Sequence, residues 1–234
     1  MRKLICALIC LLMSLSAVAR DVPGRYSVGL MGMYGWNETW KGYGGADVVG
    51  FMPFHRFFEA TAVAELHSPG ISAFTATARP KYQLPVGELF ADGSFHFRHL
   101  APYGVSDLNL AVSAGYRMDY VSVQFGVVSH LMIDNERVEN LSPGRVKEPA
   151  NFLYRVAFNV RPSSCRWNAG AGVADYTDFE YEHSCAPIYF IHGHYDLDDN
   201  FSVLLRGDLK PSGVIHMNAQ FWGISFRAGV EYKF

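Results

Sequence analysis

Residues 223–234, at the end of the chain, read GISFRAGVEYKF. Ile, Phe, Ala, Val, Tyr and Phe occupy every second position, and Gly, Ser, Arg, Gly, Glu and Lys occupy the positions between them. Successive side chains of an extended strand point to opposite faces of a sheet. The segment therefore predicts a β-strand with one apolar face and one polar face.

The same alternation recurs along most of the chain. It is clear in residues 107–117, 151–161 and 200–210, and turn-forming clusters such as 68–70 (SPG) separate these segments. After residue 19 we find no convincing amphipathic run with the helical period of about 3.6 residues. We expect twelve strands, with ten or fourteen as the alternatives. Their predicted bounds are 25–36, 45–53, 57–67, 71–82, 88–98, 107–117, 119–131, 151–161, 166–177, 186–196, 200–210 and 222–234.

So much strand would be unusual in a soluble domain, but it is typical of a sheet that crosses a membrane. Lipid offers the backbone no hydrogen bonds, so a spanning sheet must close on itself. The predicted connections alternate between short ones, such as 54–56 and 83–87, and mostly longer ones, such as 37–44 and 132–150. The fold class is therefore all-β, a closed antiparallel transmembrane β-barrel with its longer loops outside.

A secreted β-sandwich is the alternative architecture, because its strands also alternate. Aromatic residues near the predicted strand ends favour the barrel, since such residues form girdles where a membrane meets water. These residues are Tyr26, Tyr34, Trp36, Tyr82, Tyr116, Trp167 and Trp222.

Residues 1–19 have the three parts of a secretory signal peptide. Arg2 and Lys3 give a basic start, residues 4–13 are apolar, and residues 17–19 (AVA) form a cleavage site. We expect this segment to direct export through the Sec pathway and residues 20–234 to form the barrel. The mean hydropathy of +0.05 argues against a bundle of spanning helices. The net charge of -2 argues against a nucleic-acid partner.

With these features the chain resembles the bacterial outer-membrane β-barrel proteins. The resemblance covers residues 20–234 and is most specific at the end, where an alternating strand closes on an aromatic residue. In that family such an ending, here Tyr232 and Phe234, resembles the signal read by the barrel-assembly machinery. The resemblance implies a Gram-negative source, outer-membrane lipid around the barrel and the assembly machinery as a partner during biogenesis.

If the apolar face meets lipid, the other face lines the lumen, and basic residues outnumber acidic ones there. Two interpretations of this face compete. In the favoured one, opposite charges pair across a narrow barrel and fill it, because single buried charges are costly. In the other, Arg155, Arg206 and Arg227, near the mid-heights of their strands, form a basic wall that favours anions. The lumen acids are predicted to include Glu59, Glu65, Asp92 and Asp208.

Two other groups of residues suggest chemistry. His192 and His194 lie on one face of a predicted strand, so both imidazoles could reach one metal ion, although two hydrogen-bonded histidines are the simpler interpretation. Cys165 and Cys185 fall at opposite ends of the predicted barrel, so we expect two free thiols rather than a disulfide.

The sequence is most consistent with a small channel or solute-binding barrel that has a charged, partly filled lumen, a mild anion preference and no cofactor. An outer-membrane enzyme acting on lipid or peptide is one alternative. Lipid-hydrolysing barrels resemble one another in a His-x-Ser pair, and none of the nine histidines here has Ser two residues later; His130, for example, precedes Leu131 and Met132. A surface interaction protein that acts through residues 132–150 is the other alternative.

Overall fold

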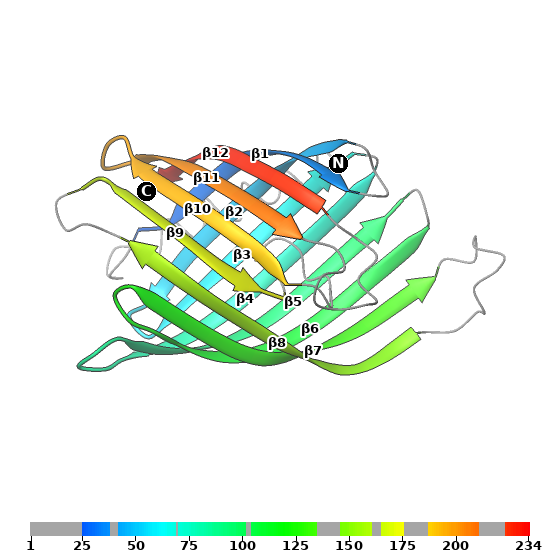
Figure 1. The fold of residues 1–234 in the computed structure, drawn as a ribbon, viewed down its shortest axis with the longest axis horizontal. Helices are drawn as coiled ribbons and strands as arrows, with labels where there is room; N and C mark the ends of the chain where they lie inside the picture. The colour runs from blue at the N-terminus through cyan, green and yellow to red at the C-terminus, as the bar shows by residue number, and fades with distance from the viewer. Residues whose placement is uncertain are drawn as a thin grey trace.

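The structure is a computed structural model that describes residues 25–37, 42–68, 70–101, 104–134, 146–160, 165–175, 187–210 and 223–234. These residues form twelve antiparallel strands, each paired with its neighbours in sequence. Pairing of β1 with β12 closes the barrel (Figure 1), so the predicted fold and strand count are confirmed. The strands are β1 Ser27–Asn37, β2 Tyr43–His55, β3 Phe58–His67, β4 Ile71–Gln83, β5 Glu88–Leu100, β6 Val105–Arg117, β7 Val121–Asp134, β8 Val146–Val160, β9 Trp167–Ala174, β10 Ile188–Asp196, β11 Phe201–Lys210 and β12 Gly223–Lys233.

Alternation along each strand sorts side chains between the inside and the outside of the barrel. In β12, Arg227 is 2% exposed while its neighbour Phe226 is 50% exposed. Large apolar side chains cover the outside of the other strands as well, and an apolar surface of this extent marks contact with a membrane or a partner. Within the described residues, no helix is long and apolar enough to span a membrane.

The two ends of the barrel differ in their connections. Ser27 pairs with Lys233, so β1 begins and β12 ends at the same rim. The connections at this rim include residues 56–57, 84–87 and 118–120, and we call it the short-turn end. The opposite rim, the loop end, carries the connections that include 135–145 and 211–222. Three of the six connections at the loop end separate their strands by more than ten residues, and the other three by five or fewer, so the predicted alternation of short and mostly longer connections is present only in part.

One predicted loop is shorter than expected. The sequence predicts a loop over 132–150, but β7 continues to Asp134 and β8 begins at Val146. The register shifts between Val128 and His130, where residues 149 and 150 of β8 lie opposite a single residue of β7. Pro149 therefore sits at a β-bulge, one of the few positions in a sheet that accept proline. The charged residues and this proline predict a loop, but the structure has a paired strand here.

The aromatic residues at the strand ends divide into two groups. Tyr34, Trp36, Tyr82 and Trp167 are exposed on the barrel, as interfacial residues would be. Tyr26 is buried instead, because its ring packs edge-on against Phe54 with the ring centres 6.4 Å apart. Tyr26 alternates with the inward-facing Ser27 and so shares the outward side of β1 with Leu30 and Tyr34. Trp222 lies outside the described residues.

Apolar side chains also fill part of the interior. Three small clusters of buried residues face inward between charged and polar groups, as a narrow barrel requires if its centre is to be packed. The clusters are Ala111 with Val128 and Leu153, Met31 with Val63, and Ala157 with Ala174 and Phe190.

Candidate functional site inside the barrel

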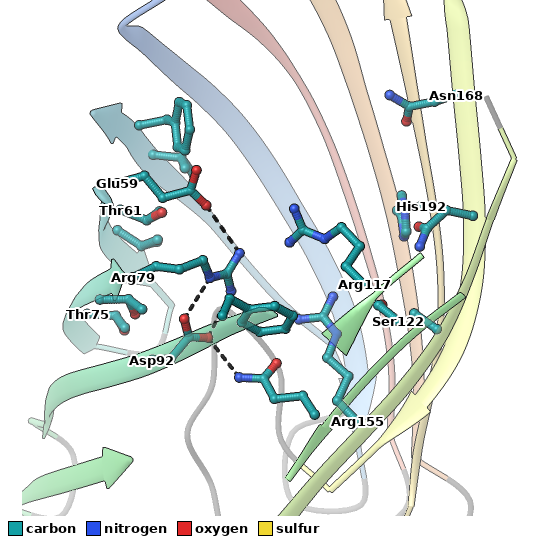
Figure 2. Close-up of a pocket in the computed structure, with 18 of the residues that line it drawn as sticks. Glu59, Thr61, Thr75, Arg79, Asp92, Arg117, Ser122, Arg155, Asn168 and His192 are labelled. Atoms are coloured by element: carbon teal, nitrogen blue, oxygen red, sulfur yellow. Dashed lines mark hydrogen bonds and ion pairs between the residues drawn. The ribbon is translucent and has the colours of Figure 1, made fainter. Parts of the chain in front are cut away.

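A cavity of about 580 Å³ lies inside the barrel. Met118 and Asp119 of the β6–β7 turn line it, so it reaches toward the short-turn end. The other lining residues come from inward-facing positions of β2 to β10. Figure 2 shows the charged and polar side chains of this cavity on two facing sides.

One side of the cavity is a chain of paired charges from β3, β4 and β5. Arg79 clamps Asp92 with Nε 2.6 Å from Oδ1 and Nη2 2.8 Å from Oδ2. Glu59 accepts a hydrogen bond from Lys81 Nζ at 2.6 Å, and Gln124 Nε2 donates to Asp92 Oδ2 at 2.7 Å. Both predicted lumen acids of this side therefore have cationic partners, which offsets the cost of placing them inside the barrel.

The facing side carries two further arginines. Arg117 and Arg155 reach into the cavity from the side opposite Glu59 (Figure 2). Arg117 Nη1 lies 3.4 Å from Glu88 Oε1 near the short-turn end. His192 and Asn168 line the same side, so the cavity places hydrogen-bond donors around its arginines.

A second group of charges is buried near β12 and β2, and we call it the Arg227 network. Arg227 Nε donates to Asp47 Oδ2 at 3.0 Å, and Nη1 donates to Asp208 Oδ2 at 2.9 Å. Arg206 Nε also donates to Asp208, at 2.9 Å from Oδ1. Glu65 Oε1 lies 3.9 Å from Arg227 Nη2. These charges can be buried together because each lies beside an opposite charge.

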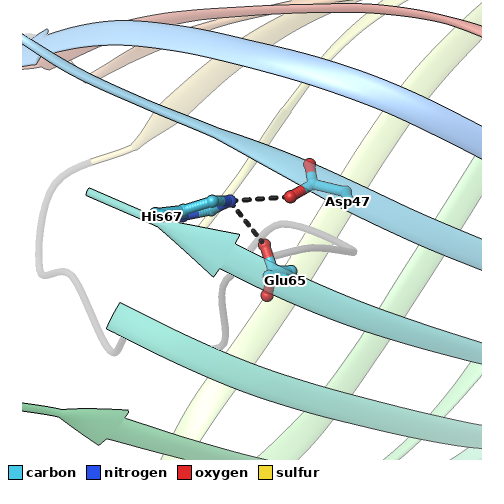
Figure 3. Close-up of side chains that lie close together, drawn as sticks. All are labelled: Asp47, Glu65 and His67. Carbon is cyan, nitrogen blue, oxygen red and sulfur yellow. Dashed lines mark hydrogen bonds and ion pairs between the residues drawn. The ribbon is translucent and has the colours of Figure 1, made fainter. Parts of the chain in front are cut away.

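His67 completes this network at the end of β3. Its Nε2 atom lies 2.7 Å from Asp47 Oδ1 and 3.9 Å from Glu65 Oε1, as Figure 3 shows. Within the described part of the chain, only these three residues form a group of three or more His, Cys, Asp or Glu whose ligand atoms lie within 4.8 Å of one another. Arg227 already supplies positive charge to both carboxylates, so we assign the group to the ion network.

The three arginines of the predicted basic wall have different surroundings. Arg206 and Arg227 are opposite each other on β11 and β12, and both contact Asp208. Arg155 lies on the cavity side, with its guanidinium carbon 4.8 Å from the centre of the Phe190 ring. Sequence reasoning did not select Arg117, Asp47 or His67 as site residues. The pairing of Asp47 with Glu65 depends on strand register, which alternation alone does not give.

The two histidines considered as metal ligands have different partners. His192 stacks on Phe190 with the ring centres 6.1 Å apart. His194 Nδ1 lies 3.2 Å from Asn168 Nδ2, and its Nε2 lies 3.3 Å from Asp196 Oδ1 and 3.6 Å from Glu231 Oε2. Each histidine thus has its own polar or aromatic partners.

Cys165 and the C-terminal residues Tyr232 and Phe234 lie at the short-turn end. Cys165 is an exposed free thiol, and Cys185 lies outside the described residues. Tyr232 and Phe234 pack edge to face with ring centres 5.0 Å apart, and the Phe234 amide donates to the carbonyl of Tyr26 at 2.9 Å. The chain end is thereby joined to the start of β1.

No protein-family model and no curated protein sequence matches this chain. The KdgM porin has a similar fold, with a TM-score of 0.54 at 10% identity over 88% of this chain and 99% of that chain. For the NanC porin the TM-score is 0.55 at 11% identity, over 88% of this chain and 100% of that chain. The translocator domain of the autotransporter NalP from Neisseria meningitidis has a TM-score of 0.56 at 13% identity, over 98% of this chain and 96% of that chain.

These similarities concern the fold, since a porin and a translocator domain share it. Together with the closed barrel of twelve strands, they show that the chain has the fold of the bacterial outer-membrane β-barrels.

Proposed function

We propose that this barrel is a channel of the Gram-negative outer membrane that passes small polar solutes and prefers anions. In this proposal residues 1–19 direct export through the Sec pathway, and the ending with Tyr232 and Phe234 is read by the barrel-assembly machinery. The short-turn end then faces the periplasm, as the arrangement of short and long connections favours.

The observation that carries the proposal is the asymmetry of the cavity. Glu59 and Asp92 already bind Arg79 and Lys81 on one side. Arg117 and Arg155 enter from the other side, near hydrogen-bond donors that can also bind an oxyanion. Rings and walls of basic side chains favour anions in other channels. In this proposal Arg117 and Arg155 supply the positive charge on which the anion preference depends.

Buried residues beside this cavity support a narrow passage. The Arg227 network and the apolar clusters occupy part of the interior, so the passage would admit only small solutes. One similar structure is described as the KdgM porin in complex with disordered oligogalacturonate. An oligogalacturonate is an anion, the class of solute that the arginines of this chain would attract.

Solute flux into liposomes tests the proposal. Protein refolded into liposomes should admit gluconate faster than sorbitol, which has a similar size and no charge. The double variant Arg117→Gln, Arg155→Gln should lose most of this difference while sorbitol entry continues. Arg56→Gln is the matched control, because Arg56 is exposed in the β2–β3 turn and does not line the cavity. Liposomes that admit neither solute would refute the channel.

A further inference from the structure

Two inward-facing phenylalanines share an unusual arrangement. Phe90 on β5 lies directly opposite Gly115 on β6, and Phe190 on β10 lies directly opposite Gly172 on β9. Both rings are buried, at 6% and 2% exposure. A Cβ atom at Gly115 would lie 2.3 Å from Phe90 Cζ, and one at Gly172 would lie 2.5 Å from Phe190 Cζ. Each ring therefore covers its glycine, where any side chain would collide with it.

The guanidinium groups of two arginines lie close to each ring. The guanidinium carbons of Arg79 and Arg117 lie 4.7 Å and 5.3 Å from the centre of the Phe90 ring. Those of Arg155 and Arg206 lie 4.8 Å and 5.3 Å from the centre of the Phe190 ring. These distances are within the range of cation–π attraction, in which the negative face of a ring holds a cation. The arrangement thus occurs twice, on well-separated strands.

The two rings lie beside the two arginines that face Glu59 across the cavity. Arg117 and Arg155 each have a long side chain with many rotamers, and such a side chain loses entropy when it is fixed in one position. A ring that is fixed against a glycine offers a rigid surface on which a guanidinium can rest. Arg79 stands over the same ring as Arg117, and Arg79 is also paired with Asp92 and Glu59.

We propose that Phe90 and Phe190 are positioning residues that set the anion preference of the channel. Each ring holds one cavity arginine, Arg117 or Arg155, toward the passing solute, and the opposing glycine makes room for the ring. This inference rests on the proposed function, since it explains how the arginines act on anions. The ring itself need not touch the solute.

Fluorinated phenylalanines separate this role from packing. Replacing Phe190 by 3,4,5-trifluorophenylalanine keeps the shape of the ring but removes most of the negative charge on its face, which is the source of the attraction. The same replacement at position 90 tests the second ring, and Phe90→Leu and Phe190→Leu remove both ring and attraction. Leu153→Ala is the control for packing, because Leu153 is buried in a different cluster and does not line the cavity.

Two measurements are made on each variant. In a KCl gradient across a planar bilayer, the reversal potential should move toward zero in the fluorinated and Leu variants and stay at the wild-type value in Leu153→Ala. The rate at which phenylglyoxal modifies Arg117 or Arg155, followed by peptide mass spectrometry, should rise about two- to five-fold when the ring beneath it is altered, as cation–π strengths imply.

The second measurement does not depend on conduction, so the two proposals can fail separately. A wild-type protein without anion preference would refute the proposed function, and the modification rates would still decide whether the rings hold the arginines. Unchanged modification rates in the fluorinated and Leu variants would overturn the inference. Unchanged reversal potentials beside a normal anion preference would also overturn it and leave the channel intact.

Discussion

At the scale of single residues, a glycine of the barrel tolerates a side chain only where the neighbouring strands leave room. A Cβ atom at Gly172 would lie 2.4 Å from the carbonyl oxygen of Val156 as well as against Phe190. A Cβ atom at Gly93, which is exposed on the outer face of β5, would have no other atom within 4 Å. The two glycines therefore differ in their surroundings: one accommodates a ring and the other borders open space.

Gly172→Ala should lower the free energy of unfolding by about 1–3 kcal/mol, as overpacking does. Gly93→Ala should leave it unchanged or raise it by up to about 1 kcal/mol, because alanine restricts the unfolded chain. Urea titration of the refolded protein in detergent micelles, followed by tryptophan fluorescence, gives both values. Equal effects of the two substitutions would contradict the close approach of Phe190 to β9.

The Arg227 network makes a second prediction at this scale. Arg227→Met leaves Asp47, Glu65 and Asp208 with less positive charge inside the barrel, so the free energy of unfolding should fall by about 3–5 kcal/mol. Adding Asp47→Asn to Arg227→Met removes one of the buried charges and should restore part of the loss. The same urea titration measures both variants. A double variant no more stable than Arg227→Met would show that the Asp47 pair does not carry the effect.

At the scale of elements, the turns at the short-turn end are held by their own side chains. In the β10–β11 turn, the backbone amides of Asn200 and Phe201 both donate to Asp198 Oδ1 at 2.8 Å. These two hydrogen bonds favour the ionised carboxylate and lower the pKa of Asp198 below its ordinary value. The carboxylate thus stabilises the hairpin only while it is charged.

Asp198 should therefore make the stability of the barrel depend on pH in acid. A group with a lowered folded-state pKa contributes its stability above the unfolded-state pKa of about 3.9 and loses it as pH falls through the folded-state pKa. The difference in unfolding free energy between wild type and Asp198→Ala should be constant near pH 7 and shrink below about pH 4. Asp199→Ala serves as the control, since the side chain of Asp199 is not the acceptor in this turn.

Sequence predicted the strands well because alternation is a local signal. The predicted segment 71–82 became Ile71–Gln83, and 200–210 became Phe201–Lys210. The predicted start of β8 is too late. Pro149 favours a loop in the sequence, but a β-bulge accommodates it within the paired strand. The interior was harder to predict. Asp47 and Arg227 are 180 positions apart and meet only because β1 and β12 close the barrel with one register. No local pattern in the sequence specifies that contact.

At the scale of the whole molecule, two different interiors share one apolar exterior. Near β12 and β2, buried charges bind one another in the Arg227 network. Between β3 and β10, Arg117 and Arg155 line the cavity. The near-zero net charge and mean hydropathy of the chain average over these opposed surfaces. A channel with anion preference is the function that this division supports.

The decisive experiment for an anion-preferring channel is the reversal potential of the purified wild-type protein in a planar bilayer. With a tenfold KCl gradient, we expect discrete conductance steps and a reversal potential of the sign that indicates more chloride than potassium current. Conductance no greater than that of the protein-free bilayer, or a reversal potential of the opposite sign, would contradict this function.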